Sequence, residues 1–341
     1  MSGDPHDPRL ERVTCADVGC GDETLPFRFL PACHWTPLIV SVPHAGLEWP
    51  SRLQPRPPVS LARNADYGVD QLFAAAPEFG AAMVVARNSR LVVDLNRAED
   101  DISALICPEH PNPRPRARPG SQEKPTLDAG RDGGGVVGPK GHRGVIWGMA
   151  VGEIRVLSRP LSHTEFEDRL RRYHRPYRRA LAELTSRRRQ RFGYAVLLDA
   201  HSMPGSVGHD FVLGTAHGRA CAPEIARTAE RALRSVSPSC SVAIDTPYPG
   251  GALVAEFGRP SQGVHALQIE VNRALYMDER RLSLRPDLTG AARSGARADG
   301  PAARREAAHD PGQEAGTLAR LHALLVALAV TQVDPSKLAG T

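Results

Sequence analysis

Two apolar segments far apart in the chain each lead into a histidine. Leu38–Val42 leads into His44, and Ala195–Leu198 leads through Asp199 into His201. Short apolar, partly β-branched runs bounded by turn-forming residues are typical of buried strands. In open α/β sheets, ligands bind beyond the carboxyl ends of the strands. We therefore expect both imidazoles at one edge of one sheet, an arrangement that suits a metal-dependent hydrolase.

The rest of the chain alternates between strand-like and helix-like patterns. Apolar spacing predicts helices over 66–79, 162–189, 223–236 and 317–330, the second of them kinked or split at Pro176. Further strands are expected at 27–30, 83–86, 91–94, 195–199, 211–213, 242–244 and 265–271. This alternation predicts an α/β fold, a three-layer α/β/α arrangement with a mixed, mostly parallel central sheet.

The length of 341 residues permits one large α/β domain or two smaller ones. We expect an N-terminal arm over 1–35, a catalytic domain over 36–280, a low-complexity linker over 281–315 and a C-terminal helix over 316–332 that packs on the domain. Residues 108–141 are rich in proline, glycine and arginine. Such a segment buries little apolar surface, so we expect a flexible insert.

Charge and cysteine content narrow the function classes. The formal net charge is +5, and arginines cluster within 171–189, where they favour a solvated helix face over a nucleic-acid site. No segment approaches a membrane span, and neither a phosphate-binding GxxxxGK[ST] loop nor a GxSxG elbow occurs. The six cysteines form no CxxC pair, and the N-terminal segment lacks the apolar stretch of a signal peptide. We expect a cytoplasmic protein with a small-molecule substrate and no nucleic-acid or membrane partner; the sequence leaves the oligomeric state open.

A hydrolytic metal site needs two or three nitrogen or oxygen ligands and one open position. An isolated histidine is usually structural, but His44 and His201 at matching strand ends favour a ligand pair. Asp66 is the first candidate for a third ligand because it opens a predicted helix soon after the first strand. Glu48, four residues beyond His44, and Asp70, one turn past Asp66, remain alternatives.

One carboxylate, Glu270, lies inside the apolar run ALQIEV. A carboxylate in a buried strand is costly unless it is paired, metal-linked or protonated, so we expect a general acid/base. The alternative is a buried ion pair with Arg273 or Arg97. Arg97 ends the segment VVDLNR after Asn96; a planar guanidinium suits a substrate carboxylate, and an amide adds a hydrogen bond. Asn96, Arg97 and Arg273 are therefore substrate-binding candidates, against the alternative of a capped turn with a surface arginine.

In their order and spacing over roughly residues 36–280, these segments resemble the N-formylglutamate amidohydrolase family. The matching motifs are VPHAG around His44, DYGVD from Asp66, SRLVVDLNR ending at Arg97, GVIW at 144–147, YHRPYR at 173–178, LDAHSMPG around His201, LGTAHG at 213–218, PYPGG at 247–251 and GVHALQIEVNRALYMDE at 263–279.

The resemblance implies a phosphorylase/hydrolase-like fold similar to that of zinc carboxypeptidases and aspartoacylases. It implies hydrolysis of N-formyl-L-glutamate, or a similar N-acyl acidic amino acid, to formate and glutamate, late in histidine breakdown. His44 and His201 would bind one divalent metal ion, zinc first and cobalt or another ion as the alternative. Glu270 would act as general acid/base on a metal-activated water, and Arg97 would anchor the substrate. The resemblance does not fix the third ligand.

Two other functions are compatible with these residues. One is a carboxypeptidase-like enzyme or a hydrolase of another N-acyl amino acid. The other is a metal-free binding protein for acidic metabolites, which the combination of two histidines with Glu270 disfavours. The arginine- and proline-rich insert and the tail after residue 280 depart from the family pattern, and both border regions that carry its motifs.

Overall fold

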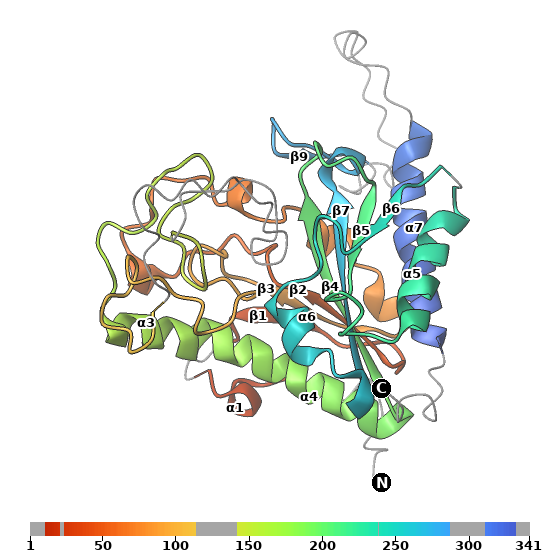
Figure 1. Cartoon of the computed structure of the whole chain (residues 1–341), viewed down its shortest axis with the longest axis horizontal. Helices are drawn as coiled ribbons and strands as arrows, with labels where there is room; N and C mark the ends of the chain where they lie inside the picture. Colours follow the sequence, from red (N-terminus) through yellow and green to blue (C-terminus); the bar gives the residue numbers. More distant parts are fainter. Residues whose placement is uncertain (1–10, 21–23, 114–141, 238, 287–310, 332–341) are drawn as a thin grey trace, which may run out of the picture.

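The computed structural model describes residues 11–20, 24–113, 142–237, 239–286 and 311–331, so most of the predicted insert and linker lies outside the described residues. Seven strands form one sheet in the order β1-β3-β2-β4-β7-β5-β6 (Figure 1). They are β1 (Phe27–Leu30), β2 (Leu38–Val42), β3 (Ala82–Ala86), β4 (Ala195–Met203), β5 (Phe211–Gly214), β6 (Val242–Ile244) and β7 (Val264–Asn272); β8 (Met277–Asp278) and β9 (Ser283–Leu284) form a separate pair.

The sheet is mixed and mostly parallel. β2 pairs in parallel with β3 and β4, β4 with β7, and β5 with β6. β1 and β5 run antiparallel to β3 and β7. β4 and β7 are the longest strands, nine residues each, and their register places His201 opposite Glu270. The predicted α/β class is confirmed.

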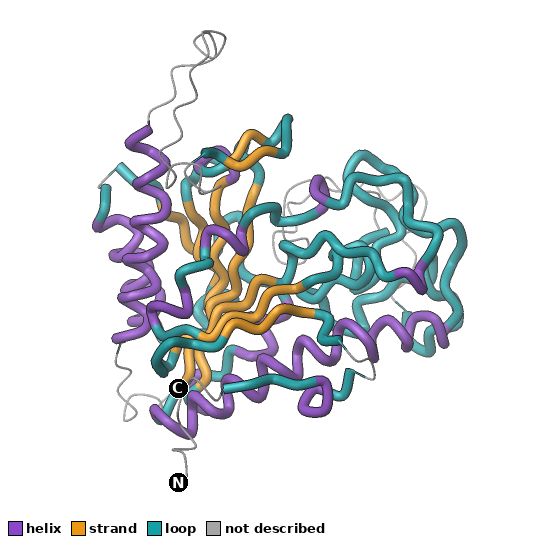
Figure 2. Tube along the Cα trace, turned by 180° about the vertical axis from the view of Figure 1, so that it is seen from behind, coloured by secondary structure: helices purple, strands orange, loops and turns teal. Residues whose placement is uncertain are grey.

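Helices cover both faces of the sheet, and Figures 1 and 2 show α5 and α7 side by side on one face and α4 along the other. Side chains alternate along a strand, so Val40 and Leu198 join one apolar core while Ile39 and Leu197 join the second. None of the described helices is long and apolar enough to cross a bilayer. The helices are α1 (Cys15–Val18), α2 (Val69–Leu72), α3 (His163–Arg169), α4 (Arg175–Phe192), α5 (Pro223–Ser235), α6 (Ala252–Phe257) and α7 (Pro311–Val330), with short turns η2 (Ser51–Leu53), η3 (Ala62–Asn64), η4 (Ala76–Phe79), η5 (Leu170–His174), η6 (Pro260–Gln262) and η7 (Arg273–Leu275).

Two predicted helices are interrupted. The one expected over 66–79 is wrong in extent, because the structure has only α2 and the turn η4 there. The ladder of hydrogen bonds four residues back ends at Phe73, because the N–H of Ala74 bonds the carbonyl of Gln71. Pro77, in η4, has no N–H with which to resume this ladder. In place of the kink or split predicted at Pro176, the π-helical turn η5 lies between α3 and α4, and Pro176 is in the first turn of α4. α3 begins at a capping box of Ser162 and Glu165.

The strand predicted at 91–94 is wrong. These residues form buried turns, in which Val92 N donates to Ser89 O and Asp94 N donates to Val145 O. Figure 2 shows that loops gather beside α3 and form a lobe of their own. The apolar run is buried beneath this lobe, which is why a loop has the composition of a strand.

A buried ion pair attaches the N-terminal segment to α4. Glu11 and Arg188 are both fully buried, and their side chains form two hydrogen bonds of 2.5 and 2.8 Å. The Arg188 guanidinium also lies over the Trp35 ring, 4.3 Å from its centroid. β1, at the predicted position, then joins the edge of the sheet. The division of the chain into arm, catalytic domain, linker and terminal helix stays a prediction.

We expect Glu11→Ala to lower the free energy of unfolding by about 3–5 kcal/mol, because it leaves a guanidinium buried without its counter-charge. Urea unfolding followed by circular dichroism measures the loss. Arg227→Ala is the control: its ion pair with Glu224 is exposed, so a change below about 1 kcal/mol is expected. Equal effects of the two substitutions would contradict a structural role for the buried pair.

Candidate active site

The three predicted metal ligands meet at the carboxyl ends of β2 and β4. His44 lies two residues after β2, while His201 lies inside β4, which continues to Met203 instead of ending at residue 199. The backbone N–H of Asp66 donates to the carbonyl of His44, which fixes the turn before α2. Asp66 Oδ2 lies 3.4 Å from His44 Nδ1 and 3.0 Å from His201 Nδ1. All three residues are buried with their ligand atoms within 4.8 Å of one another, so they can hold a metal ion.

A second carboxylate orients each imidazole. His44 Nε2 lies 2.7 Å from Asp94 Oδ1, and His201 Nε2 lies 2.8 Å from Asp199 Oδ2. A carboxylate on one ring nitrogen of a histidine leaves the other nitrogen to face a metal. Both histidines therefore present Nδ1 toward Asp66.

The donor set and the local charge fit a divalent cation. His44 Nδ1 and Glu270 Oε2 are buried without a hydrogen-bond partner. Two nitrogens and one oxygen, with a further position open, are the ligands of catalytic zinc sites. Four buried carboxylates, those of Asp66, Asp94, Asp199 and Glu270, surround the two histidines, and a divalent ion held between them would favour their ionised forms.

The carboxyl groups of the site differ in their pKa values. Burial opposes ionisation of Asp66, but the imidazoles of His201 and His44 hold its pKa well below the ordinary value. Burial likewise opposes ionisation of Asp94, and Arg90 and His44 hold the pKa of Asp94 well below its usual range. Burial raises the pKa of Glu270 to about 8, with His201 opposing the shift. The candidate ligand is thus ionised, while Glu270 retains a proton near neutral pH without a bound metal.

Glu270 is positioned by its own strand. Its Oε1 accepts from Gln268 Nε2 at 2.9 Å, and Gln268 Oε1 in turn accepts from the backbone N–H of Gly251 at 2.8 Å. The alternative that Glu270 forms a buried ion pair with Arg97 or Arg273 is wrong within the described residues: Arg97 lies 3.5 Å from Asp101, and Arg273 lies 3.2 Å from Asp66 Oδ1.

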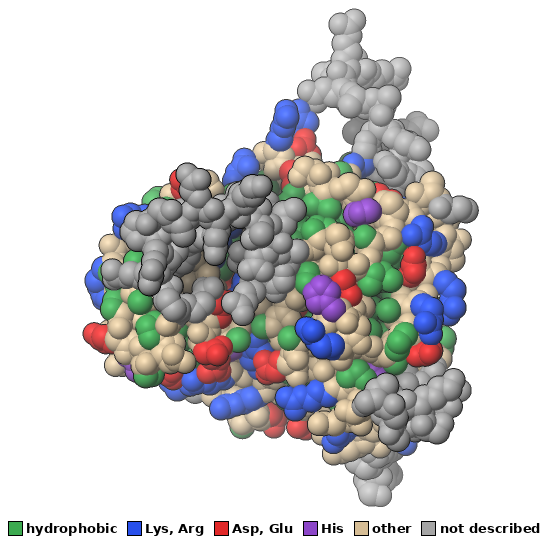
Figure 3. Space-filling model, in the orientation of Figure 1, with side chains coloured by type: hydrophobic (Ala, Val, Ile, Leu, Met, Phe, Trp, Pro, Cys, Tyr) green, Lys and Arg blue, Asp and Glu red, His purple; other side chains and the backbone are tan. Residues whose placement is uncertain are grey.

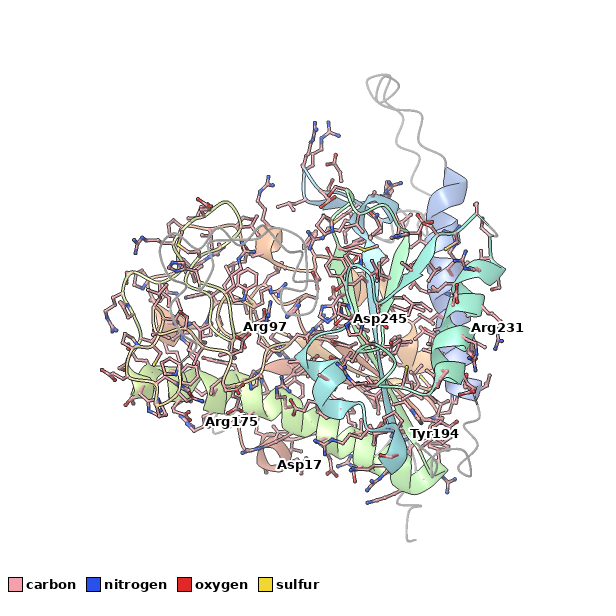
Figure 4. The ribbon with its side chains drawn as sticks, in the orientation of Figure 1. Asp17, Arg97, Arg175, Tyr194, Arg231 and Asp245 are labelled. Atoms are coloured by element: carbon pink, nitrogen blue, oxygen red, sulfur yellow. The ribbon has the colours of Figure 1, made fainter. Side chains whose placement is uncertain are left out.

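Two cavities flank the His–Asp–His cluster. The first, of about 420 Å³, is lined by both histidines and Glu270, together with Asn96 and Arg97. Figure 4 labels Arg97 where the loop lobe meets the sheet. The second cavity, of about 450 Å³, is lined by Asp66 and Arg273 among others, and Arg90 lines both cavities.

The predicted substrate-binding residues are therefore divided between the cavities. Arg97 faces the first cavity and Arg273 the second. Asn96 also contacts the His–Asp–His cluster, because its Nδ2 lies 3.1 Å from His201 Nε2. Its Oδ1 accepts from the backbone N–H of Leu253. Its amide holds the loop of 94–97 against β4 and α6.

The two alternative third ligands lie away from the cluster. The side chain of Glu48 is 60% exposed and lies 3.6 Å from Arg87. Asp70 forms an ion pair of 2.5 Å with Arg28 on β1. Of the three carboxylates considered, the structure brings only Asp66 to the histidines.

Asp94, Arg90 and Trp147 are among the residues near the cluster to which the sequence assigns no role. Asp94 accepts from Arg90 at 2.7 Å and from Trp147 Nε1 at 3.1 Å while it orients His44. They lie in the motifs SRLVVDLNR and GVIW, so the signal was present. Their roles depend on how two loops meet, which no periodicity predicts.

On the face in Figure 3, basic and acidic side chains of the described residues are interspersed.

The mixed α/β sheet, with the His–Asp–His cluster beside a buried glutamate, is an arrangement suited to a hydrolase. Comparison with known proteins identifies the family to which the chain belongs. A family model, N-formylglutamate amidohydrolase, matches residues 36–277, and the chain belongs to this family. It is accordingly an enzyme, a hydrolase of linear amide bonds.

Individual relatives agree with this assignment. The chain is 31% identical over 275 residues to an N-formylglutamate deformylase of Pseudomonas aeruginosa, covering 76% of this chain and 89% of that protein. It is 30% identical over 256 residues to an N-formylglutamate deformylase of Pseudomonas putida, covering 71% and 82%. The crystal structure of N-formylglutamate amidohydrolase from Ralstonia eutropha JMP134 is similar with a TM-score of 0.63 at 28% identity, covering 88% of this chain and 97% of that one.

Proposed function

We propose that this enzyme hydrolyses N-formyl-L-glutamate, or a similar N-acyl acidic amino acid, to formate and glutamate with the help of one divalent metal ion, zinc above all. The observation that carries the proposal is the buried cluster of His44, Asp66 and His201 next to Glu270. The printed names of the two Pseudomonas relatives support this substrate. The reaction would take the place in histidine breakdown that the resemblance implies.

In the proposed mechanism, the metal would be held by His44, His201 and Asp66, whose ligand atoms lie close together. A divalent cation, when bound there, lowers the pKa of water and polarises the substrate carbonyl. Glu270 accepts a proton from the attacking water at Oε2, the oxygen without a hydrogen-bond partner, and delivers it to the nitrogen of the leaving amine. Gln268 holds the other carboxylate oxygen, which keeps Oε2 directed to the site.

We propose that Arg97, with Asn96 nearby, binds the carboxylates of the amino acid in the first cavity. Arg273 would act from the other side, where its guanidinium bonds Asp66 Oδ1 and Ser202 Oγ and so steadies the metal-binding carboxylate as well. Because a formyl group is small, most of the binding energy should come from the amino acid end.

The test combines metal analysis of the purified protein with an assay of formate release from N-formylglutamate. We expect about one zinc per chain and formate release that a chelator removes and added zinc restores. Release of an amino acid from peptides but not of formate would favour a carboxypeptidase-like enzyme. Full-length protein that binds acidic metabolites with neither metal nor turnover would favour a binding protein.

A further inference from the structure

Apart from Arg273 and Asp66, the residues that line the second cavity have no role in the proposed reaction, although this cavity borders the same His–Asp–His cluster. Its lining includes three more arginines than carboxylates, and we call it the basic cavity. The motif GVIW, whose residues have no assigned function, reaches it through Trp147. The charged residues that line it are Arg63, Arg90, Arg143, Arg273, Arg280, Asp66 and Glu279.

The inner wall of the basic cavity is held in place by an arginine–tryptophan stack. The guanidinium groups of Arg90 and Arg143 each lie 4.6 Å from the centroid of the Trp147 ring. Trp147 is buried, and its indole N–H bonds Asp94, which in turn bonds His44. The quadrupole of an indole ring attracts a cation above its face, and more strongly where water is excluded, so the stack favours positive charge beside the candidate ligands.

Two further arginines stand at the rim of this cavity. Arg63 donates to the backbone carbonyl of Arg280, and both side chains line the opening. No carboxylate of a described residue lies within ion-pair distance of either guanidinium. Within the described part of the chain, the rim can therefore accept an anion without first breaking an ion pair.

The position of Glu270 determines which end of the substrate faces the basic cavity. Glu270 must reach the nitrogen of the leaving amine, and it lines only the first cavity. The amino acid then lies in the first cavity, and the acyl group points past the metal cluster toward Asp66. A formyl hydrogen fills almost none of the roughly 450 Å³ available there.

We propose that the basic cavity is an acyl-binding site for acyl groups that end in a carboxylate, so that the enzyme also hydrolyses amides formed between a dicarboxylic acid and an amino acid. This inference rests on the proposed function. Water is the co-reactant: its oxygen bonds to the acyl carbon as the carbon–nitrogen bond breaks, and its protons pass to the amine and to solvent. The products are the free dicarboxylic acid and the amino acid.

Three glutamate amides distinguish charge from volume in the metal-loaded enzyme. N-formylglutamate tests the proposed function, N-succinylglutamate tests the inference, and N-butanoylglutamate has the same acyl length without the charge. We expect N-succinylglutamate to be hydrolysed with a kcat/KM at least about tenfold above that of N-butanoylglutamate, the range of one charge-assisted hydrogen bond. Turnover of N-formylglutamate with none of N-succinylglutamate would overturn the inference and leave the proposed function standing. The reverse pattern would support the inference and exclude N-formylglutamate as the substrate, and no turnover of any amide would overturn both the inference and the proposed function.

Variants locate the acyl group. Arg63→Ala with Arg280→Ala should lower the ratio of kcat/KM for N-succinylglutamate to that for N-formylglutamate about tenfold or more. Arg281→Ala, on the same exposed turn but outside the cavity lining, should leave this ratio unchanged. Arg97→Ala should raise KM for both amides alike, since they share the amino acid. If the rim variant instead raises KM for both amides equally, the amino acid occupies the basic cavity and the inference is wrong.

Discussion

Replacing Glu270 with glutamine is expected to reduce formate release by about 10²–10⁴-fold while the protein keeps its full metal content. Glutamine has the shape of glutamate, and its amide oxygen can still accept the hydrogen bond from Gln268 Nε2. It cannot accept a proton from water or deliver one to the amine. The loss should fall on kcat, because Glu270 is not one of the three clustered ligand residues.

A matched substitution on the surface is the control for any general effect of removing one carboxylate from the protein. Glu224 lies on α5, where its carboxylate pairs with Arg227 in an exposed position. Glu224→Gln should leave both kcat and metal content unchanged. A Glu270→Gln enzyme with normal turnover would remove Glu270 from the mechanism, and one that lost its metal would show that the residue acts by holding the site together.

The sheet could be predicted because its central strands are buried on both faces. Leu38–Val40 and Ala195–Leu198 are continuous apolar runs, and such runs occur where a parallel sheet is covered by helices on both sides. The same logic failed at 91–94, since a loop buried under other loops has the same composition. An apolar run therefore indicates that a segment is buried, but it does not show whether the segment is a strand or a loop.

The site was predictable to the extent that it depends on strand ends. His44 and His201 follow from two strands that are neighbours in the sheet, and Glu270 follows from the cost of a carboxylate in a third. Asp66 was chosen over two alternatives on its position alone. The orientation of His44 by Asp94 is not predictable from sequence, because the pattern of residues 91–94 is that of a strand and the contact of Asp94 with Trp147 forms only when two loops fold together.

The second large effect is expected from Asp66→Asn, which should lower zinc affinity by at least about 100-fold and abolish formate release with it. An asparagine keeps the size of the side chain and lets the turn before α2 form. It removes the negative charge that the imidazoles stabilise and offers a neutral oxygen, which is a poorer zinc ligand than a carboxylate. Competition with a chromogenic chelator measures the affinity.

The other carboxylates of this region provide a graded series on the same assay. Asp94→Asn should weaken zinc binding by about 10–100-fold, since Asp94 contacts the ligand His44 and not the metal position. Asp70→Asn and Glu48→Gln should leave the affinity unchanged, because these side chains pair with Arg28 and Arg87 away from the histidines. If Asp70→Asn loses zinc while Asp66→Asn retains it, the third ligand has been misassigned. The order of the four zinc affinities tests the assignment of the third ligand more sharply than the loss of activity in any one variant. Activity can be lost for many reasons, whereas this order of affinities is expected only if Asp66 is the ligand.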